Sequence, residues 1–201
     1  MPAPLEIHGF ETSNNMKVRV ALGFKGLDYT FHKVDPAADR ERLFALSGQH
    51  LTPVMVHGDV VLFDSAAILR YLEANFRDTP PLFGRDQAEQ WVIEDEEFFA
   101  RTTLAGPAME VVHARVLGRP LDADRQADCA RRMNAAIEAL AARLDGRDWL
   151  VGAGMSAADV TAACVLHRFR KAELFAFTPA LDGLVPWIER VMAFDRHQAG
   201  A

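Results

Sequence analysis

The stretch LTPVMVHGDVVLFDSAAILRYLE, residues 51–73, carries the main signals for the fold of this chain. Two short apolar runs flank His57-Gly58-Asp59, a pattern typical of a β-hairpin with a tight turn. Apolar residues at helical spacing then follow over residues 66–76 and predict a helix with one buried stripe. The stretch therefore predicts two antiparallel strands followed by a helix, with Asp64 and Ser65 between them.

Upstream of this stretch, strand-like and helix-like patterns alternate. Residues 5–8 alternate like a strand, residues 16–24 predict a helix that ends before Gly26, and residues 29–34 are aromatic and β-branched. A right-handed crossover sets the two strands of such a βαβ unit parallel. With a further helix over residues 40–46, the first half is predicted to run β-α-β-α-β-β-α.

Downstream, the pattern changes. Two prolines stiffen a linker over residues 78–81, and almost nothing after it reads as a strand. Ser156-Ala157-Ala158-Asp159 has the pattern of a capping box at a helix start. We therefore predict an α/β domain over residues 1–79 and an all-α domain over residues 86–201. The helices of the second domain are expected at 87–101, 105–117, 123–144, 156–173 and 184–193.

Composition narrows the classes of function. The chain has 201 residues with 22 basic and 28 acidic side chains, a formal charge of −6, which argues against nucleic acid as the main partner. It has no apolar run long enough to span a membrane and no signal-like start, so we expect a cytoplasmic protein without membrane contact.

The cysteines and the acidic run do not predict a catalytic or metal site. We expect Cys129 and Cys164 to be buried and reduced. His167 shares a helix face with Cys164, but two ligands are too few for zinc, so no metal site is predicted. The acidic run at residues 94–97 is predicted to be a solvated helix face.

Three features of the first domain point to a binding site. Pro53 stands at a strand start, where a cis bond would turn the Thr52 backbone outward and a trans bond would merely end a loop. Asp64 and Ser65 can cap the following helix, or can hold the ammonium and carboxylate of an amino acid.

The third feature is the polar loop at residues 11–15, after the first strand. Ligands bind at the carboxyl ends of strands in open parallel sheets, and Thr12 and Ser13 also precede a helix whose dipole favours an anion. The alternative is that these side chains only cap the helix.

The whole chain resembles the cytosolic glutathione transferases, in particular the serine-type members of bacterial, phi-like and theta-like kind. The likeness lies in residues 12–19 (TSNNMKVR), Thr52-Pro53-Val54, residues 62–68 (LFDSAAI) and the capping box. The resemblance implies a thioredoxin-like N-terminal domain, an all-α C-terminal domain and glutathione as co-substrate. The first domain has no cysteine, which excludes disulfide exchange through an enzyme thiol there.

The resemblance also implies how glutathione would bind. Its cysteinyl backbone would pair with Thr52 ahead of a cis Pro53, and its γ-glutamyl end would meet Asp64 and Ser65. Leu51 stands where the family more often has a polar residue that contacts the peptide. The two remaining predicted contacts, which could substitute for it, are Gln49 and His50.

The predicted chemistry is activation of the glutathione thiol as a thiolate. Thr12 would donate its hydroxyl proton to the sulfur, with Ser13 and Asn14 as competing donors in the same loop. An apolar electrophile would lie near Phe10, Met109 and His113. The resemblance implies a homodimer that acts in detoxification.

Two alternatives remain open at this point. The protein could be a non-catalytic binding or assembly protein with the same fold, or an enzyme of another glutathione-dependent reaction such as isomerisation, dehalogenation or ether cleavage.

Overall fold

The computed structural model describes residues 3–197 of the chain. These residues form two compact units. The first unit holds residues 3–82 together with 193–197, and the second unit holds Phe83–Met192. The sequence had placed residues 193–197 in the helical domain, whereas the structure groups them with the first unit.

The first unit has the predicted order of elements, βαβαββα. Its sheet has the strand order β2-β1-β3-β4, in which β1 is parallel to β2 and antiparallel to β3, and β3 is antiparallel to β4. The thioredoxin-like fold class is therefore confirmed for this unit. The elements are β1 (Leu5–Gly9), α1 (Ser13–Phe24), β2 (Thr30–Lys33), α2 (Arg40–Ser47), β3 (Val54–His57), β4 (Val60–Leu62) and α3 (Ser65–Asn75).

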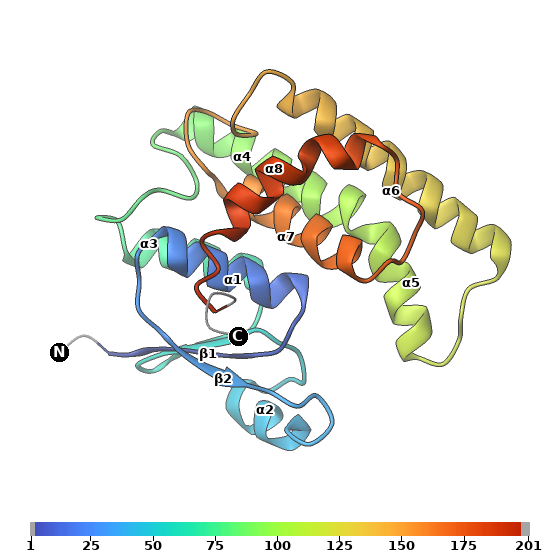
Figure 1. Cartoon of the computed structure of the whole chain (residues 1–201). Helices are drawn as coiled ribbons and strands as arrows, with labels where there is room; N and C mark the ends of the chain where they lie inside the picture. Colours follow the sequence, from blue (N-terminus) through green and yellow to red (C-terminus); the bar gives the residue numbers. More distant parts are fainter. Residues whose placement is uncertain (1–2, 198–201) are drawn as a thin grey trace. The chain divides into compact units, whose positions relative to one another are not determined.

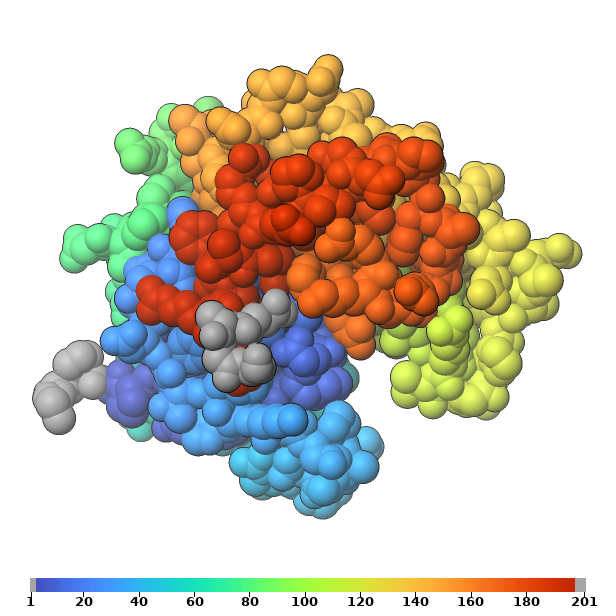
Figure 2. Space-filling model, viewed as in Figure 1, coloured from blue at the N-terminus to red at the C-terminus, as the bar shows by residue number. Residues whose placement is uncertain are grey.

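The two faces of this sheet have different covers. Figure 1 shows α1 and α3 together over one face and α2 on the other. The β1 side chains alternate between these faces. Ile7 is fully buried, whereas His8 lies opposite Val54, which belongs to a small apolar cluster with Val34 and Leu43 of α2. Figure 2 shows α2, in pale blue, at the surface of the first unit.

The second unit is helical, as predicted. Asp159 completes the predicted capping box at the start of α7: its carboxylate accepts from the Ser156 N–H (3.0 Å) and hydroxyl (2.8 Å). It also accepts from the Leu150 N–H (2.9 Å) and from Trp187 Nε1 (3.1 Å), so one buried carboxylate joins a loop, α7 and α8. The elements are α4 (Gln87–Phe99), a π-helical segment (Ala100–Leu104), α5 (Gly106–Val116), α6 (Ala123–Leu144), α7 (Ala157–Lys171) and α8 (Ala180–Met192).

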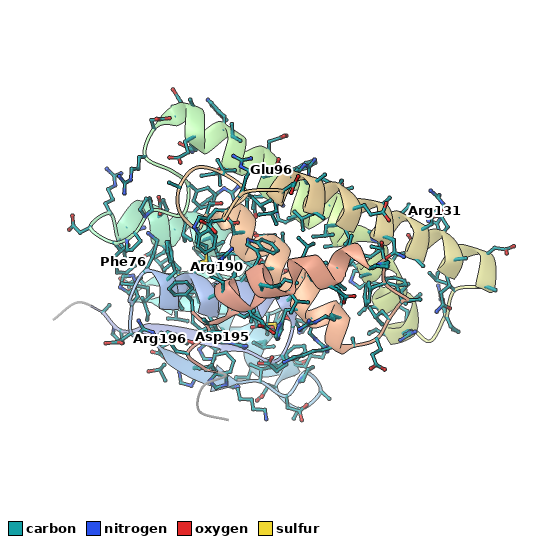
Figure 3. The ribbon with its side chains drawn as sticks, turned by 45° about the horizontal axis from the view of Figure 1, so that its top comes forward. Phe76, Glu96, Arg131, Arg190, Asp195 and Arg196 are labelled. Atoms are coloured by element: carbon teal, nitrogen blue, oxygen red, sulfur yellow. The ribbon has the colours of Figure 1, made fainter. Side chains whose placement is uncertain are left out.

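The acidic run on α4 is not the solvated face that the sequence predicted. Glu97 is 1% exposed, and its carboxylate contacts Arg101 Nε at 3.1 Å. Glu96, labelled in Figure 3, is half-buried and lies 3.3 Å from Arg143. The prediction is wrong for these two residues because arginines on the following π-helical segment and on α6 compensate their charge.

The segment at residues 193–197 joins the first unit through a buried ion pair. Asp195, which Figure 3 shows beside Arg196, accepts from Arg19 Nε (3.0 Å) and from its terminal nitrogen (2.8 Å). Both side chains of this pair are fully buried, and the same guanidinium reaches Glu11 at 2.8 Å. Burial alone would lower the pKa of Arg19, but the hydrogen bond and charge of Asp195 raise it.

Two smaller predictions can also be compared with the structure. Cys129 and Cys164 are buried free thiols, as expected. No helix within residues 3–197 combines the length and apolar character needed to cross a bilayer.

Candidate functional site

The sheet topology brings the predicted site segments to one end of the first unit. His8 pairs with Val54 and Met55 pairs with Leu62, so the end of β1, the start of β3 and the end of β4 are neighbours. The segments that follow or precede these strand ends contain Thr12, Thr52-Pro53 and Asp64-Ser65. Segments far apart in the sequence therefore meet because the strands pair in this register.

Thr12 is the N-cap of α1. Its hydroxyl oxygen accepts from the backbone N–H of Asn15 at 3.3 Å and from the Asn15 side-chain amide at 2.7 Å. A hydroxyl oxygen has two acceptor lone pairs and one proton to donate. Both acceptor positions are occupied, so the only hydrogen-bonding capacity that Thr12 offers a ligand is its proton.

Asn15 also joins this loop to the start of β3. Its amide nitrogen donates to the Thr52 hydroxyl at 3.0 Å, and its side chain is 0% exposed. Gly9 makes room for it, because a Cβ at Gly9 would lie 1.6 Å from the Asn15 Oδ1. The structure thus brings Thr12 and Thr52 together through a buried residue that the sequence reasoning missed. The available signal was the order of residues: the first strand ends in Gly9, a polar loop follows, and an amide, Asn15, stands at the third position of the next helix.

The peptide bond between Thr52 and Pro53 is cis, as the resemblance implies. Among the hydrogen bonds within residues 3–197, none uses the backbone N–H or C=O of Thr52. Pro53 is buried and Thr52 is half-buried. Backbone groups of Thr52 are thus available for an extended ligand to pair with.

The start of α3 resolves the choice between Asp64 and Ser65 as helix cap. Asp64 is the N-cap, and its Oδ1 accepts from the Ala67 N–H at 2.9 Å. The Asp64 side chain is exposed, while Ser65 is the first helical residue and 7% exposed. Capping uses one carboxylate oxygen, so the second oxygen remains for a ligand cation.

The other predicted site residues differ in the hydrogen-bonding groups that they leave free for a ligand. Ser13 is buried, whereas Asn14 is exposed and its Oδ1 accepts from Lys17 Nζ at 3.0 Å. The Gln49 amide nitrogen is used within its own loop, donating to the Ser47 hydroxyl (2.9 Å) and to the Leu51 carbonyl (3.0 Å).

His50 and Leu51 lie in the same loop as Gln49. The Gln49 side-chain oxygen accepts from the Leu51 N–H, so both ends of this amide serve the loop itself. His50 Nδ1 lies 3.1 Å from the Arg40 carbonyl, and its ring stacks on Phe44. Leu51 is 67% exposed. Of these side chains, His50 therefore retains a ring nitrogen, Nε2, whereas both donor protons of Gln49 are used and its oxygen keeps one acceptor position.

The residues predicted to line the electrophile pocket belong to different units. Phe10 is a half-buried residue of the first unit, while Met109 (half-buried) and His113 (exposed) lie on α5 of the second. The pocket remains a prediction.

Comparisons with known proteins give the family. Residues 7–80 match the glutathione S-transferase N-terminal domain, and residues 122–190 match the C-terminal domain. Glutathione S-transferase F10 of Arabidopsis thaliana is 27% identical over 157 residues, which cover 74% of this chain and 73% of that protein. FtsZ-localized protein A of Caulobacter vibrioides is 33% identical over 163 residues, 75% of this chain and 70% of that protein.

The chain belongs to the glutathione S-transferase family. A solved structure of a glutathione S-transferase from Xanthobacter autotrophicus Py2 has a TM-score of 0.74 at 26% identity, over 94% of this chain and 93% of that chain. The family's N-terminal domain match includes the segments of Thr12, Thr52-Pro53 and Asp64-Ser65. The glutathione S-transferase fold thus accounts for why these three segments meet.

Proposed function

We propose that this protein is a glutathione S-transferase that activates the glutathione thiol as a thiolate for attack on an apolar electrophile. The observation that carries the proposal is the hydroxyl of Thr12, whose acceptor positions are filled by Asn15 so that it acts as a hydrogen-bond donor. This donor lies at the N-terminus of α1 and next to Thr52, whose backbone is open to pairing.

The proposed mechanism depends on stabilising the thiolate over the thiol. A free thiol has a pKa of about 8.5, and lowering it by two units requires about 2.7 kcal/mol. One hydrogen bond from a hydroxyl to an anionic sulfur, together with the partial positive charge of a helix N-terminus, is enough for that amount. The thiolate then attacks the electrophile and the leaving group departs with the electron pair, so the protein needs no nucleophile of its own.

Binding would orient the tripeptide for this step. The Thr52 N–H and C=O would pair with the cysteinyl backbone of glutathione. The γ-glutamyl carboxylate would meet the Ser65 hydroxyl and the N-terminus of α3, and its ammonium would meet the exposed Asp64 carboxylate. His50 and Gln49 remain proposed contacts, although the hydrogen bonds of Gln49 within its loop favour His50.

The test combines binding and turnover. Calorimetry should show saturable glutathione binding that weakens at least tenfold in Ser65→Ala. Turnover with a chlorodinitrobenzene should fall at least tenfold at pH 6.5 in Thr12→Val, with glutathione binding nearly unchanged. Full activity of Thr12→Val, combined with loss of activity in Ser13→Ala or Asn14→Ala, would move the donor role to the next residues of the loop.

A second candidate is a non-catalytic binding protein with the same fold. It is supported by the similarity to FtsZ-localized protein A and by Leu51, an exposed apolar residue at the rim of the proposed site. Absence of glutathione binding, together with co-sedimentation with FtsZ filaments, would favour this reading. The matched variant is Leu51→Gln, which removes the exposed apolar side chain at the rim and should weaken filament binding.

Further properties belong to the same proposal. Isomerisation, dehalogenation or ether cleavage would use the same thiolate, and product analysis by mass spectrometry separates them from conjugation. A homodimer, a cytoplasmic location and a role in detoxification follow from the family analogy. Light scattering and growth of a deletion strain on toxic electrophiles test the first and the last.

A further inference from the structure

Glu6, His8 and His32 gather on one face of the sheet of the first unit. Glu6 and His8 are two positions apart on β1 and therefore point to the same face. The parallel register places His32 of β2 directly opposite His8. One ligand atom from each of the three side chains lies within 4.8 Å of the other two.

One hydrogen-bonded contact joins Glu6 to His32 and does not include His8. Glu6 Oε2 lies 2.7 Å from His32 Nε2, and each of these side chains is about one-third exposed. His8 stacks on His32 with ring centroids 4.4 Å apart, but it is 8% exposed and its Nδ1 has no hydrogen-bond partner within the described chain. A buried ring nitrogen without a partner is uncommon and needs an explanation.

Burial and neighbouring groups act on the His8 ring. Burial lowers the pKa of His8, and the neighbouring His32 and Arg42 lower it further, while Glu6 opposes them. The neutral imidazole is the form of histidine that coordinates a metal ion.

We propose that Glu6, His8 and His32 form a binding site for a divalent transition-metal ion such as Zn²⁺. Two imidazoles and one carboxylate are a donor set that suits zinc and its neighbours, whereas Mg²⁺ and Ca²⁺ prefer oxygen donors. Three protein ligands leave at least one coordination position for water.

The geometry requires a small closure. Metal–nitrogen bonds of about 2.1 Å place donor atoms on one ion about 3–3.5 Å apart. His8 is fixed by burial, whereas the partly exposed Glu6 and His32 side chains can rotate towards it and tilt the stacked rings. The ion would then join β2, one of the two edge strands of the sheet, to β1.

Arg42 on α2 should weaken the binding of a metal ion at this site. Its positive charge acts on His8, although its guanidinium also pairs with Asp39 at 3.0 Å. A cation at this site is repelled by Arg42, so Arg42→Gln should bind the metal several-fold more tightly than the unchanged chain.

The experiment uses the full chain without a histidine tag and without glutathione, which itself binds metals. Zn²⁺ titration by calorimetry should give one ion per chain and a rise in melting temperature, and Co²⁺ should give visible absorption bands of a nitrogen and oxygen site. Glu6→Gln and His32→Gln should each weaken binding at least tenfold. The matched control is His57→Gln, since His57 lies on β3 with its Nδ1 at 2.8 Å from the Tyr71 hydroxyl.

Three outcomes would overturn the proposal. They are no metal binding by the unchanged chain, binding that persists in both Glu6→Gln and His32→Gln, and Co²⁺ spectra dominated by sulfur charge transfer, which would assign the metal to Cys129 or Cys164. Glutathione binding is measured separately and does not enter this result.

Discussion

Asn15→Asp is the sharpest test of the hydroxyl donor at Thr12. Aspartate has nearly the shape of asparagine but accepts hydrogen bonds where the amide donates. In place of an amide 2.7 Å from Thr12 Oγ1 and 3.0 Å from Thr52 Oγ1, a carboxylate would take the Thr12 proton for itself. The thiolate would then lose its donor and face a new negative charge, and both changes raise the thiol pKa.

The size of the effect follows from that one bond. A hydrogen bond to a charged group contributes about 1.5–3 kcal/mol, which corresponds to about 1–2 pKa units. Well below the thiol pKa, the thiolate fraction and the rate should therefore fall about 10- to 100-fold, while at alkaline pH the rates of mutant and parent converge.

The assay is the absorbance of the bound thiolate as a function of pH, together with the pH profile of turnover. Asn15→Ala should give an intermediate thiol pKa, because it removes the orienting amide without adding an acceptor. Asn75→Asp is the control for the same substitution at an exposed position of the first unit, and it should leave the profile unchanged. An unchanged thiol pKa in Asn15→Asp, with the protein folded, would refute the reasoning.

Three further predictions concern the framework of the site. Gly9→Ala should mimic loss of the buried amide, with a raised thiol pKa, because its Cβ would displace that amide by steric overlap; unchanged pH profiles would contradict this. Asp195→Ala should destabilise the first unit in urea by about 3–5 kcal/mol because it leaves a buried guanidinium without its main partner. The control Asp28→Ala removes a fully exposed carboxylate that pairs with Arg196 and should leave stability nearly unchanged. Asp159→Ala removes a buried carboxylate that accepts from four donors, and should lower the free energy of unfolding of the second unit by about 3 kcal/mol or more. Its control is Asp122→Ala, which removes an exposed N-cap and should lower that free energy by about 1 kcal/mol. Equal losses in the two variants would refute the role of burial.

Local signals were enough to predict the elements of the first unit. The turn at Gly58-Asp59 needs a residue that tolerates a positive φ, and Gly58 has a φ of 59° in the observed hairpin between β3 and β4. The start of α1 was predicted three residues late, because Ser13, Asn14 and Asn15 have low helix propensity. These residues are helical because Thr12 caps them, and a cap is a property of position rather than of propensity.

Long-range partners could not be predicted in the same way. Residues 193–197 carry no strand or helix pattern of their own. Their contacts with the first unit include the buried pair between Asp195 and Arg19 and the ring contact between Phe194 and Phe24. The role of Asn15 depends on Thr52, which approaches it only because β3 pairs with β1. In both cases the sequence contains the polar groups, but only the fold decides which of them meet.

The two readings of Asp64, helix cap and ligand contact, are compatible in physical terms. The Ala67 N–H occupies Oδ1 at 2.9 Å, and the carboxylate keeps a second oxygen on an exposed side chain. Capping also fixes the orientation of that second oxygen, so a ligand ammonium meets a group whose rotamer entropy has already been lost. Asp64→Asn retains an oxygen that can cap but removes the charge, and should therefore leave α3 stable while weakening glutathione binding about tenfold. A loss of stability equal to that of Asp64→Ala, with unchanged binding, would show that the carboxylate serves the helix alone.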